Sequence, residues 1–247
     1  MNRFFFSAGQ RQGDRVTLGV DDAHHLRSVL RCAKGEEIEL CDEKGCCFSA
    51  TIAHAGREGV ECVLTDVLPA REAAVRFTLA FSLLKGEKND LLLRSGTELG
   101  LAGFLPFSSE HSVVRLETKK TSRTNRWQRI VRAAAGQARR DLLPEVAHLH
   151  TWEEFLAVLP HYKRKILFFE GKGGLSLSTA LHDVAPGDRV LLITGPEGGF
   201  AAAEVAEVSV LGGITVTLGP RILRAETSAV AAAALALYQA GELGGKG

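Results

Sequence analysis

The sequence predicts an α/β protein in which a parallel sheet with helices on both faces follows a smaller, β-rich N-terminal domain. From residue 76 onward, short apolar runs typical of buried strands alternate with helical patterns. Before residue 67 the signals are mostly of the β type and are separated by turn residues. Residues 67–74 break the pattern with Pro69, which is unsuited to a central strand. We therefore expect two domains, residues 1–70 and 74–247.

In the N-terminal domain, apolar runs predict strands over residues 38–41, 48–53 and 60–64. A helical pattern over residues 22–30 interrupts them, and Asp21 or Asp22 is the expected N-cap. In the C-terminal domain, strands are expected over 77–84, 103–108, 165–169, 189–194 and 214–218. Helices are expected over 88–99, 122–140, 152–158, 201–211 and 226–239. A parallel sheet of this kind binds ligands beyond the carboxyl ends of its strands.

Composition narrows the class of protein. The chain has 247 residues, of which 45% are hydrophobic and 24% charged, as in ordinary globular domains. No apolar run approaches the roughly 18 residues of a membrane span, and the first residues lack the apolar core of a signal peptide. A cytoplasmic protein is therefore expected. The five cysteines are odd in number and show no C-x-x-C spacing, which predicts reduced thiols and no metal cluster.

Two glycine loops carry the sharpest functional signal. An apolar strand runs into the loop 195–199, and a second strand runs into the loop 218–224. Each loop leads into a helix, so the pair could form opposite walls of a ligand cleft, with Arg221 and Arg224 beside the ligand. The alternatives are tight turns and a solvated loop with Glu226 or Thr227 as helix cap. The spacing fits neither a dinucleotide fingerprint nor a P-loop.

Positive charge is concentrated in the middle of the chain. Residues 73–165 carry 16 Lys and Arg against 9 Asp and Glu, although the whole chain has a net charge of only +1. The densest stretch runs from Lys119 to Arg132, where four arginines recur at every third position and cover about half of a helix surface. Such a surface can track phosphates, which suggests an RNA partner, although a charged helix is often only a solvated face.

The two loops also resemble a known family. The segments GPEGG at 195–199 and LGPRILRAET at 218–227 are similar to the C-terminal signature of the ribosomal RNA small subunit methyltransferase E family, of the SPOUT class. Further segments match in the family's order: HHLRSVLR at 24–31, KGEK at 85–88, ELG at 98–100, RW at 126–127, Gln137 and PE at 144–145. The resemblance therefore covers nearly the whole chain.

This resemblance implies a fold and an activity. It implies a PUA-like RNA-binding domain followed by a SPOUT domain tied in a trefoil knot, and a homodimer with cofactor pockets beside the interface. The expected reaction is methylation of N3 of a specific uridine in 16S small-subunit ribosomal RNA by S-adenosyl-L-methionine. We expect the substrate to be the assembled 30S subunit, with no membrane and no metal involved.

The resemblance also implies site residues. The expected cofactor-binding residues are Phe169, Leu192, Gly195, Glu197, Gly198, Leu218, Gly219, Leu223 and Arg224. Arg224 is the expected catalytic residue, because it could stabilise the charge that develops on the uracil oxygens when N3 loses its proton. The expected RNA-binding residues are Arg3, His25, Arg27, Arg31, Lys88, Arg126, Arg129 and Arg139.

Two positions depart from the family pattern. Gly136 stands where glutamate is usual, and Thr194 stands where an apolar residue is common. Two other functions are less well supported by the sequence. A non-catalytic RNA-binding protein is disfavoured by the intact glycine loops, and a hydrolase or nucleotide-using enzyme by the missing G-x-S-x-G and G-K-[ST] motifs.

Overall fold

The computed structural model describes residues 2–56, 58–112, 120–171 and 174–244, apart from the side chains of 120–122. Lys119, the first residue of the basic stretch, lies outside the described residues. The chain forms two compact units. Unit 1 comprises residues Met1–Glu72 and Ala135–Leu143, and unit 2 comprises Ala73–Ala134 and Pro144–Gly247.

Unit 1 is built on a curved, mostly antiparallel sheet. Its strands are β1 (Arg3–Phe5), β2 (Arg11–Gln12), β3 (Arg15–Leu18), β4 (Glu37–Cys41), β5 (Cys47–Ala55) and β6 (Val60–Val67). Their order is β1-β4-β5-β6-β3-β2, and only the β1–β4 pair is parallel. Alternation along the strands points one face inward, so that Val16, Leu18 and Ile52 are fully buried in one core.

The helix predicted over residues 22–30 begins earlier and has a different cap. α1 (Val20–His24) continues into a π-helical turn, η2 (His25–Val29), and its N-cap is Gly19. The predicted caps Asp21 and Asp22 lie instead in the first turn, where their carboxylates interact favourably with the positive end of the helix dipole. A short 3-10 turn, η1 (Ala8–Gln10), completes unit 1.

The prediction of five reduced thiols is wrong for two of the cysteines. Cys41 and Cys47 form a disulfide, with their Cα atoms 4.0 Å apart. The two residues are directly paired in the β4–β5 ladder, because the hairpin turn between them returns the chain at this point. Cys32, Cys46 and Cys62 are free. The useful signal was the position of two cysteines on either side of a turn, rather than their total number.

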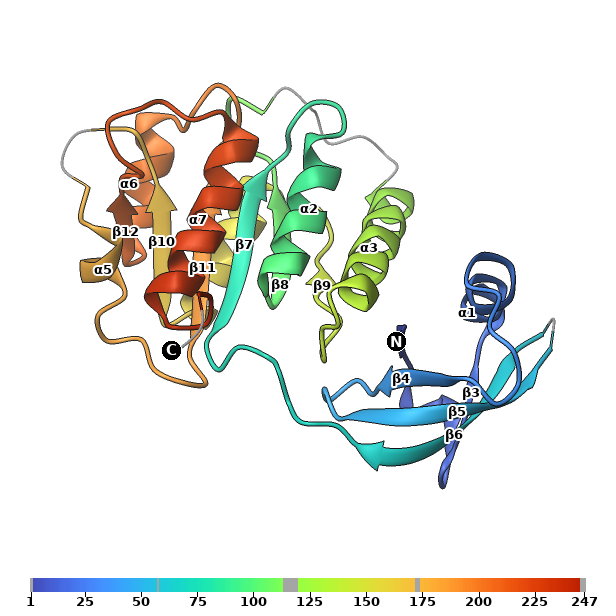
Figure 1. Ribbon diagram of the computed structural model, residues 1–247. Coiled ribbons are helices and arrows are strands. Elements are labelled where there is room, and N and C mark those ends of the chain that lie inside the picture. Colours follow the sequence, from blue (N-terminus) through green and yellow to red (C-terminus); the bar gives the residue numbers. More distant parts are fainter. Residues whose placement is uncertain (1, 57, 113–119, 172–173, 245–247) are drawn as a thin grey trace. The chain divides into compact units, whose positions relative to one another are not determined.

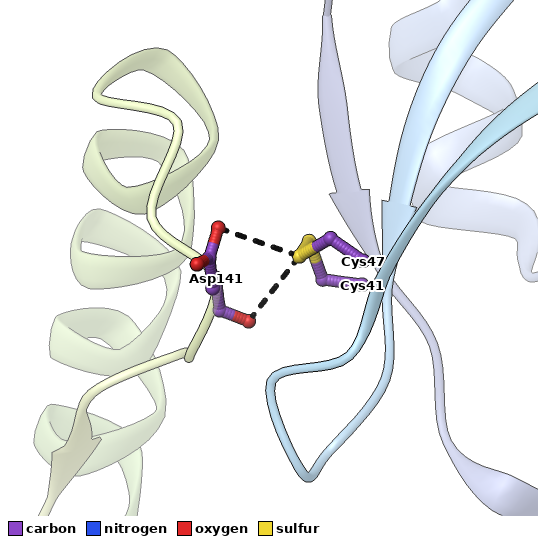
Figure 2. A group of neighbouring side chains, drawn as sticks. All are labelled: Cys41, Cys47 and Asp141. Carbon is purple, nitrogen blue, oxygen red and sulfur yellow. Dashed lines mark hydrogen bonds between the residues drawn. A yellow bond between two sulfur atoms is a disulfide. The ribbon is translucent and has the colours of Figure 1, made fainter. Parts of the chain in front are cut away.

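The disulfide faces a buried carboxylate. Figure 2 shows the Cys47 sulfur beside Asp141, 3.5 Å from Oδ1 and 3.8 Å from the carbonyl oxygen. Cys41, Cys47 and Asp141 lie close enough together to suggest a metal site. However, the two sulfur atoms are bonded to each other and Asp141 forms an ion pair with Arg3. In this state the three residues do not offer a set of free ligands to a metal ion.

Gly136 allows the end of α3 (Lys120–Gln137) to approach β1 closely. A Cβ atom at Gly136 would lie 2.8 Å from the carbonyl oxygen of Arg3, closer than real Cβ contacts. The neighbouring Ala135 is fully buried against Phe5 and the Cys41–Cys47 disulfide. At this position the close approach of the helix to the strand leaves no room for a Cβ atom unless the backbone shifts.

Gly136→Ala is expected to destabilise unit 1 by about 1–3 kcal/mol, the usual cost of overpacking, although alanine favours a helix by about 1 kcal/mol. The obstacle is a backbone carbonyl, which no rotamer change can remove. Hydrogen exchange of the β4 and β5 amides measures the effect. Gly9→Ala is the matched control in the same unit, since nothing lies within 4 Å of a Cβ there. Equal protection in both variants would contradict the steric explanation.

Unit 2 is a fully parallel sheet with helices on both faces. Its strands are β7 (Arg76–Ser82), β8 (Gly103–Phe107), β9 (Glu145–Val146), β10 (Arg164–Phe168), β11 (Arg189–Thr194) and β12 (Gly213–Val216). Their order is β12-β10-β11-β7-β8-β9, with every pair parallel. The helices are α2 (Lys88–Leu99), most of α3, α4 (Trp152–Val158), η3 (Leu159–His161), α5 (Leu177–Ala180), α6 (Ala202–Val210) and α7 (Ala225–Gln239). Figure 1 shows α2 and α7 side by side over the sheet.

Alternate side chains of the strands serve the two faces. Ala80, Leu191 and Ile193 pack with Phe155 of α4 and Val208 of α6 in one buried cluster. On the other face, α7 contacts β7 and β11 and packs against α2. The predicted α/β fold with a smaller β-rich unit is thus confirmed, and the predicted strands and helices of unit 2 all occur within a few residues of their expected bounds. β1, β2, β3, β9 and α5 were not predicted. Within the described residues, no helix is both long and apolar enough to span a membrane.

Candidate functional site

A cavity of about 460 Å³ opens at the carboxyl ends of β10, β11 and β12. The residues that follow these strands form its walls, as expected for a parallel sheet. The lining residues are Lys88, Phe168, Phe169, Glu170, Gly195, Pro196, Glu197, Gly199, Phe200, Thr217, Leu218, Gly219, Arg221, Ile222, Leu223, Arg224, Ala225 and Ser228. Both predicted glycine loops therefore meet at one cavity, and its volume lies within the range of small-molecule sites.

The glycines give these loops their path. Gly199 (φ +72°) and Gly219 (φ +105°) have left-handed backbone conformations that other residues rarely adopt. Nothing lies within 4 Å of a Cβ built at Gly219, so the backbone there borders open space. At Gly195 the missing Cβ makes room for the ring of Phe200, whose nearest atoms would be 3.0 Å away. The loops are thus shaped to bring backbone atoms to a ligand.

Seven of the nine residues predicted to bind a cofactor line the cavity: Phe169, Gly195, Glu197, Leu218, Gly219, Leu223 and Arg224. The other two do not. Leu192 is fully buried within β11, where it supports the sheet beneath the cavity. Gly198 lies in the loop but faces His111 instead, and a Cβ at this position would lie 2.9 Å from the Cβ of His111.

Gly198→Ala is expected to weaken ligand binding about 10-fold, because the clash with His111 displaces the loop and disturbs its contacts with the ligand. His111 Nδ1 also lies 3.1 Å from the carbonyl oxygen of Gly199, so the segment that carries His111 is in direct contact with the loop 195–199. Adding His111→Gly removes the obstructing Cβ and should restore most of the affinity in the double variant. Ligand titration by calorimetry measures the affinity of both variants. An equal loss of affinity in the single and double variants would show that the clash is not the cause.

An ion-pair cluster lies at one side of the cavity. The ammonium nitrogen of Lys88, at the start of α2, is 3.1 Å from Glu197 Oε1 and 3.3 Å from Glu226 Oε2. The hydrogen bond to Glu197 raises the pKa of Lys88. Burial raises the pKa of Glu197, but the backbone amides of Glu197 and Lys85 and the ammonium of Lys88 together hold it below its usual range. Lys88 and Glu197 are therefore both charged at neutral pH.

Arg224 stands at the N-cap of α7 and lines the cavity with an exposed side chain. The helix begins at Ala225, so Glu226 and Thr227 lie inside its first turn and the alternative of either residue as its cap is wrong. Arg221 and Ile222 line the same wall of the cavity, and the side chain of Ile222 is almost fully exposed. A guanidinium group placed in this way can pair with negative charge on a ligand or on RNA.

Two of the predicted RNA-binding residues have other roles in the structure. Arg3 is buried, and its side chain pairs with Glu39 and Asp141, so the predicted contact between Arg3 and RNA is wrong. Lys88 lies in the cavity wall and is held by two carboxylates. The remaining six are exposed: His25, Arg27, Arg31, Arg126, Arg129 and Arg139. Arg126 forms a bidentate ion pair with Asp90 while remaining accessible at the surface.

The comparisons with known proteins agree with this organisation. Residues 71–237 match the model of an RNA methyltransferase domain, and residues 11–65 match that of an RNA methyltransferase PUA domain. The chain is 30% identical to ribosomal RNA small subunit methyltransferase E of Bacillus subtilis, over 97% of both chains. It is 33% identical to the Synechocystis protein of the same name, over 89% of this chain and 71% of that protein.

A solved structure shares the whole fold. The ribosomal RNA small subunit methyltransferase E of Neisseria gonorrhoeae, crystallised with bound S-adenosyl methionine, superposes with a TM-score of 0.85 at 29% identity. The match covers 96% of this chain and 97% of that one. Both the β-rich unit and the parallel-sheet unit are therefore found together in a protein that binds a small cofactor.

Proposed function

We propose, because this chain belongs to the ribosomal RNA small subunit methyltransferase E family, that it transfers a methyl group from S-adenosyl-L-methionine to N3 of one uridine in 16S ribosomal RNA. The observation that carries the proposal is the cavity between the two glycine loops, at the carboxyl ends of three parallel strands. Unit 1, which contains the match to the PUA domain model, would bind the RNA.

The cavity fits the proposed cofactor. Gly199 and Gly219 line the cavity, and the space beside Gly219 is open to a ligand such as an adenosine. Phe168, Leu218 and Leu223 offer apolar surface to the adenine ring, and the carboxylates of Glu170 and Glu197 complement a ligand with ammonium and sulfonium charges. The wall thus combines the apolar and acidic groups that this ligand requires.

When bound, S-adenosyl-L-methionine supplies an activated methyl group on a sulfonium, so the protein has mainly to bind, orient and exclude water. We assign the orientation of the cofactor to Glu197 and the glycine loops. We assign to Arg224 the stabilisation of negative charge on the uracil oxygens that flank N3, since its guanidinium borders the same cavity.

RNA recognition and assembly complete the proposal. The exposed set His25, Arg27, Arg31, Arg126, Arg129 and Arg139 supplies positive charge for phosphates. From the family resemblance we further propose a trefoil knot, a homodimer, the assembled 30S subunit as substrate and a cytoplasmic location. Exposed apolar side chains on α2 and α7, among them Leu91, Leu235 and Tyr238, support a subunit interface on these helices.

Transfer of labelled methyl from S-adenosyl-L-methionine to small ribosomal subunits tests the proposal. The subunits come from a strain without this enzyme, and the modified base is mapped afterwards. Label at N3 of one uridine is the expected result. Cofactor binding without transfer would disprove the assigned substrate, and no cofactor binding at all would favour a non-catalytic RNA-binding protein.

A further inference from the structure

We infer that Lys88 is a positioning residue that ties the two walls of the cofactor cavity together by holding Glu197 and Glu226 at once. This inference rests on the proposed function, because it assigns to Lys88 a part in the binding of the same cofactor. It replaces the expected contact between Lys88 and RNA. It also gives a role to Glu226, which lies in the first turn of α7 rather than at its cap.

The three residues come from three separate segments. Lys88 is the first residue of α2, Glu197 lies in the glycine loop after β11, and Glu226 lies in the first turn of α7, directly after the loop 218–224. The ammonium nitrogen is 3.1 Å from Glu197 Oε1 and 3.3 Å from Glu226 Oε2. One side chain therefore connects both cavity-forming loops to a helix outside them.

A second hydrogen bond to Glu197, from the segment just before α2, strengthens this connection. The backbone amide of Lys85 donates to Glu197 Oε1 at 3.2 Å, so the same oxygen receives two donors from the segment 85–88. Two donors on one oxygen fix the orientation of the carboxylate, whereas a single ion pair would leave it free to rotate. The loop 195–199 is thereby held at its acidic residue, between its glycines.

The charges explain why the lysine is required. Two carboxylates face one ammonium group, and the side chain of Glu226 is only 13% exposed, so little water is available to screen its charge. Without Lys88, Glu197 and Glu226 would repel each other across the cavity wall. The two loops would then move apart, and a ligand would have to draw them together before it could bind.

The test compares four variants of the full chain. Lys88→Met removes the charge, Lys88→Arg keeps it, Glu226→Gln removes one partner, and the fourth variant combines Lys88→Met with Glu226→Gln. Lys163→Met is the matched control, because Lys163 forms a comparable surface ion pair with Asp188. Lys163 lies just before β10, at the amino ends of the strands and so at the end of the sheet opposite the cavity. The probes are S-adenosyl-L-methionine and S-adenosylhomocysteine, titrated by calorimetry.

Lys88→Met is expected to weaken the binding of both probes about 10-fold, the loss of one charge-assisted hydrogen bond, while Lys88→Arg recovers most of the affinity. The double variant should bind no more weakly than Lys88→Met, because both substitutions break the same link. The melting temperature should shift no more than in Lys163→Met, since the Lys88 side chain is itself partly exposed and such ion pairs add little to global stability. Losses that simply multiply in the double variant would overturn the inference.

A second readout needs no cofactor. In the ligand-free protein, Lys88→Met should accelerate hydrogen exchange at the amides of Glu197, Gly198 and Gly199, and Lys163→Met should not. Unchanged exchange in Lys88→Met would overturn the inference even if the wild type binds the cofactor normally. If the wild type itself fails to bind either probe, the proposed function falls, and the exchange data still decide whether Lys88 holds the loops.

Discussion

Arg224→Ala is expected to reduce methyl transfer at least about 100-fold, the usual effect of removing one group that stabilises developing negative charge. The guanidinium borders the cavity and is exposed, and the substitution changes neither the extended backbone of this N-cap position nor the buried core. Cofactor affinity should fall much less than the rate, because in the proposed reaction the charge on the uracil oxygens develops only as N3 loses its proton.

The measurement is single-turnover methyl transfer to small ribosomal subunits, together with calorimetric titration of the cofactor. Arg224→Lys is the informative companion, since it keeps the charge but loses the planar pair of donors, and its rate should lie between those of the wild type and Arg224→Ala. A single-turnover rate in Arg224→Ala close to that of the wild type would remove Arg224 from the mechanism. An equal loss of rate and cofactor affinity would reduce its role to binding.

The layout of unit 2 could be predicted because its signals are local. Buried parallel strands are continuous apolar runs, such as Val190 to Ile193, and β7, β10, β11 and β12 are each followed by glycine before the next helix. The strands of unit 1 were harder to place. β1 has three residues, all buried, and pairs with β4 across more than thirty intervening residues, so nothing in its immediate sequence distinguishes it from a loop.

The position of the cavity was predictable, but its network of charges was not. Glycine loops at two strand ends indicate a binding site whatever the rest of the chain does. By contrast, the family resemblance and the clustering of basic residues predict RNA contacts for Lys88 and Arg3, whereas the structure pairs both side chains with carboxylates. Their acidic partners lie far away in the sequence, with Asp141 138 positions from Arg3, and only the folded chain brings them together.

Arg3→Met is expected to destabilise unit 1 by about 3–5 kcal/mol, the usual effect of removing one partner of a buried ion pair. The Arg3 side chain is 0% exposed; its Nε donates to Glu39 Oε2 at 2.8 Å, and Nη1 donates to Asp141. Nη1 also donates to the carbonyl oxygen of Arg139 at 2.7 Å. Methionine fills similar space but leaves two buried carboxylates without a cation.

The free thiol of Cys62 makes this loss measurable within unit 1. Cys62 is fully buried in the core of the β-sheet, and burial raises the pKa of its thiol to about 12, so it reacts with an alkylating reagent only when the unit opens. Under conditions of rapid opening and closing, Arg3→Met should increase the alkylation rate of Cys62 about 100-fold or more, in proportion to the loss of stability.

Arg27→Met is the matched control for this experiment, because Arg27 is an exposed arginine of the same unit that makes one 3.3 Å hydrogen bond to the carbonyl oxygen of Gly56. Its alkylation rate should remain within a few fold of the wild type, since surface contacts contribute little. Asp141→Asn should also open the unit, and the double variant Arg3→Met/Asp141→Asn should lose less than the two single losses combined, because both break one interaction. Additive losses would mean that Arg3 and Asp141 act independently, and that the end of α3 is held to β1 by packing at Ala135 and Gly136 rather than by this ion pair.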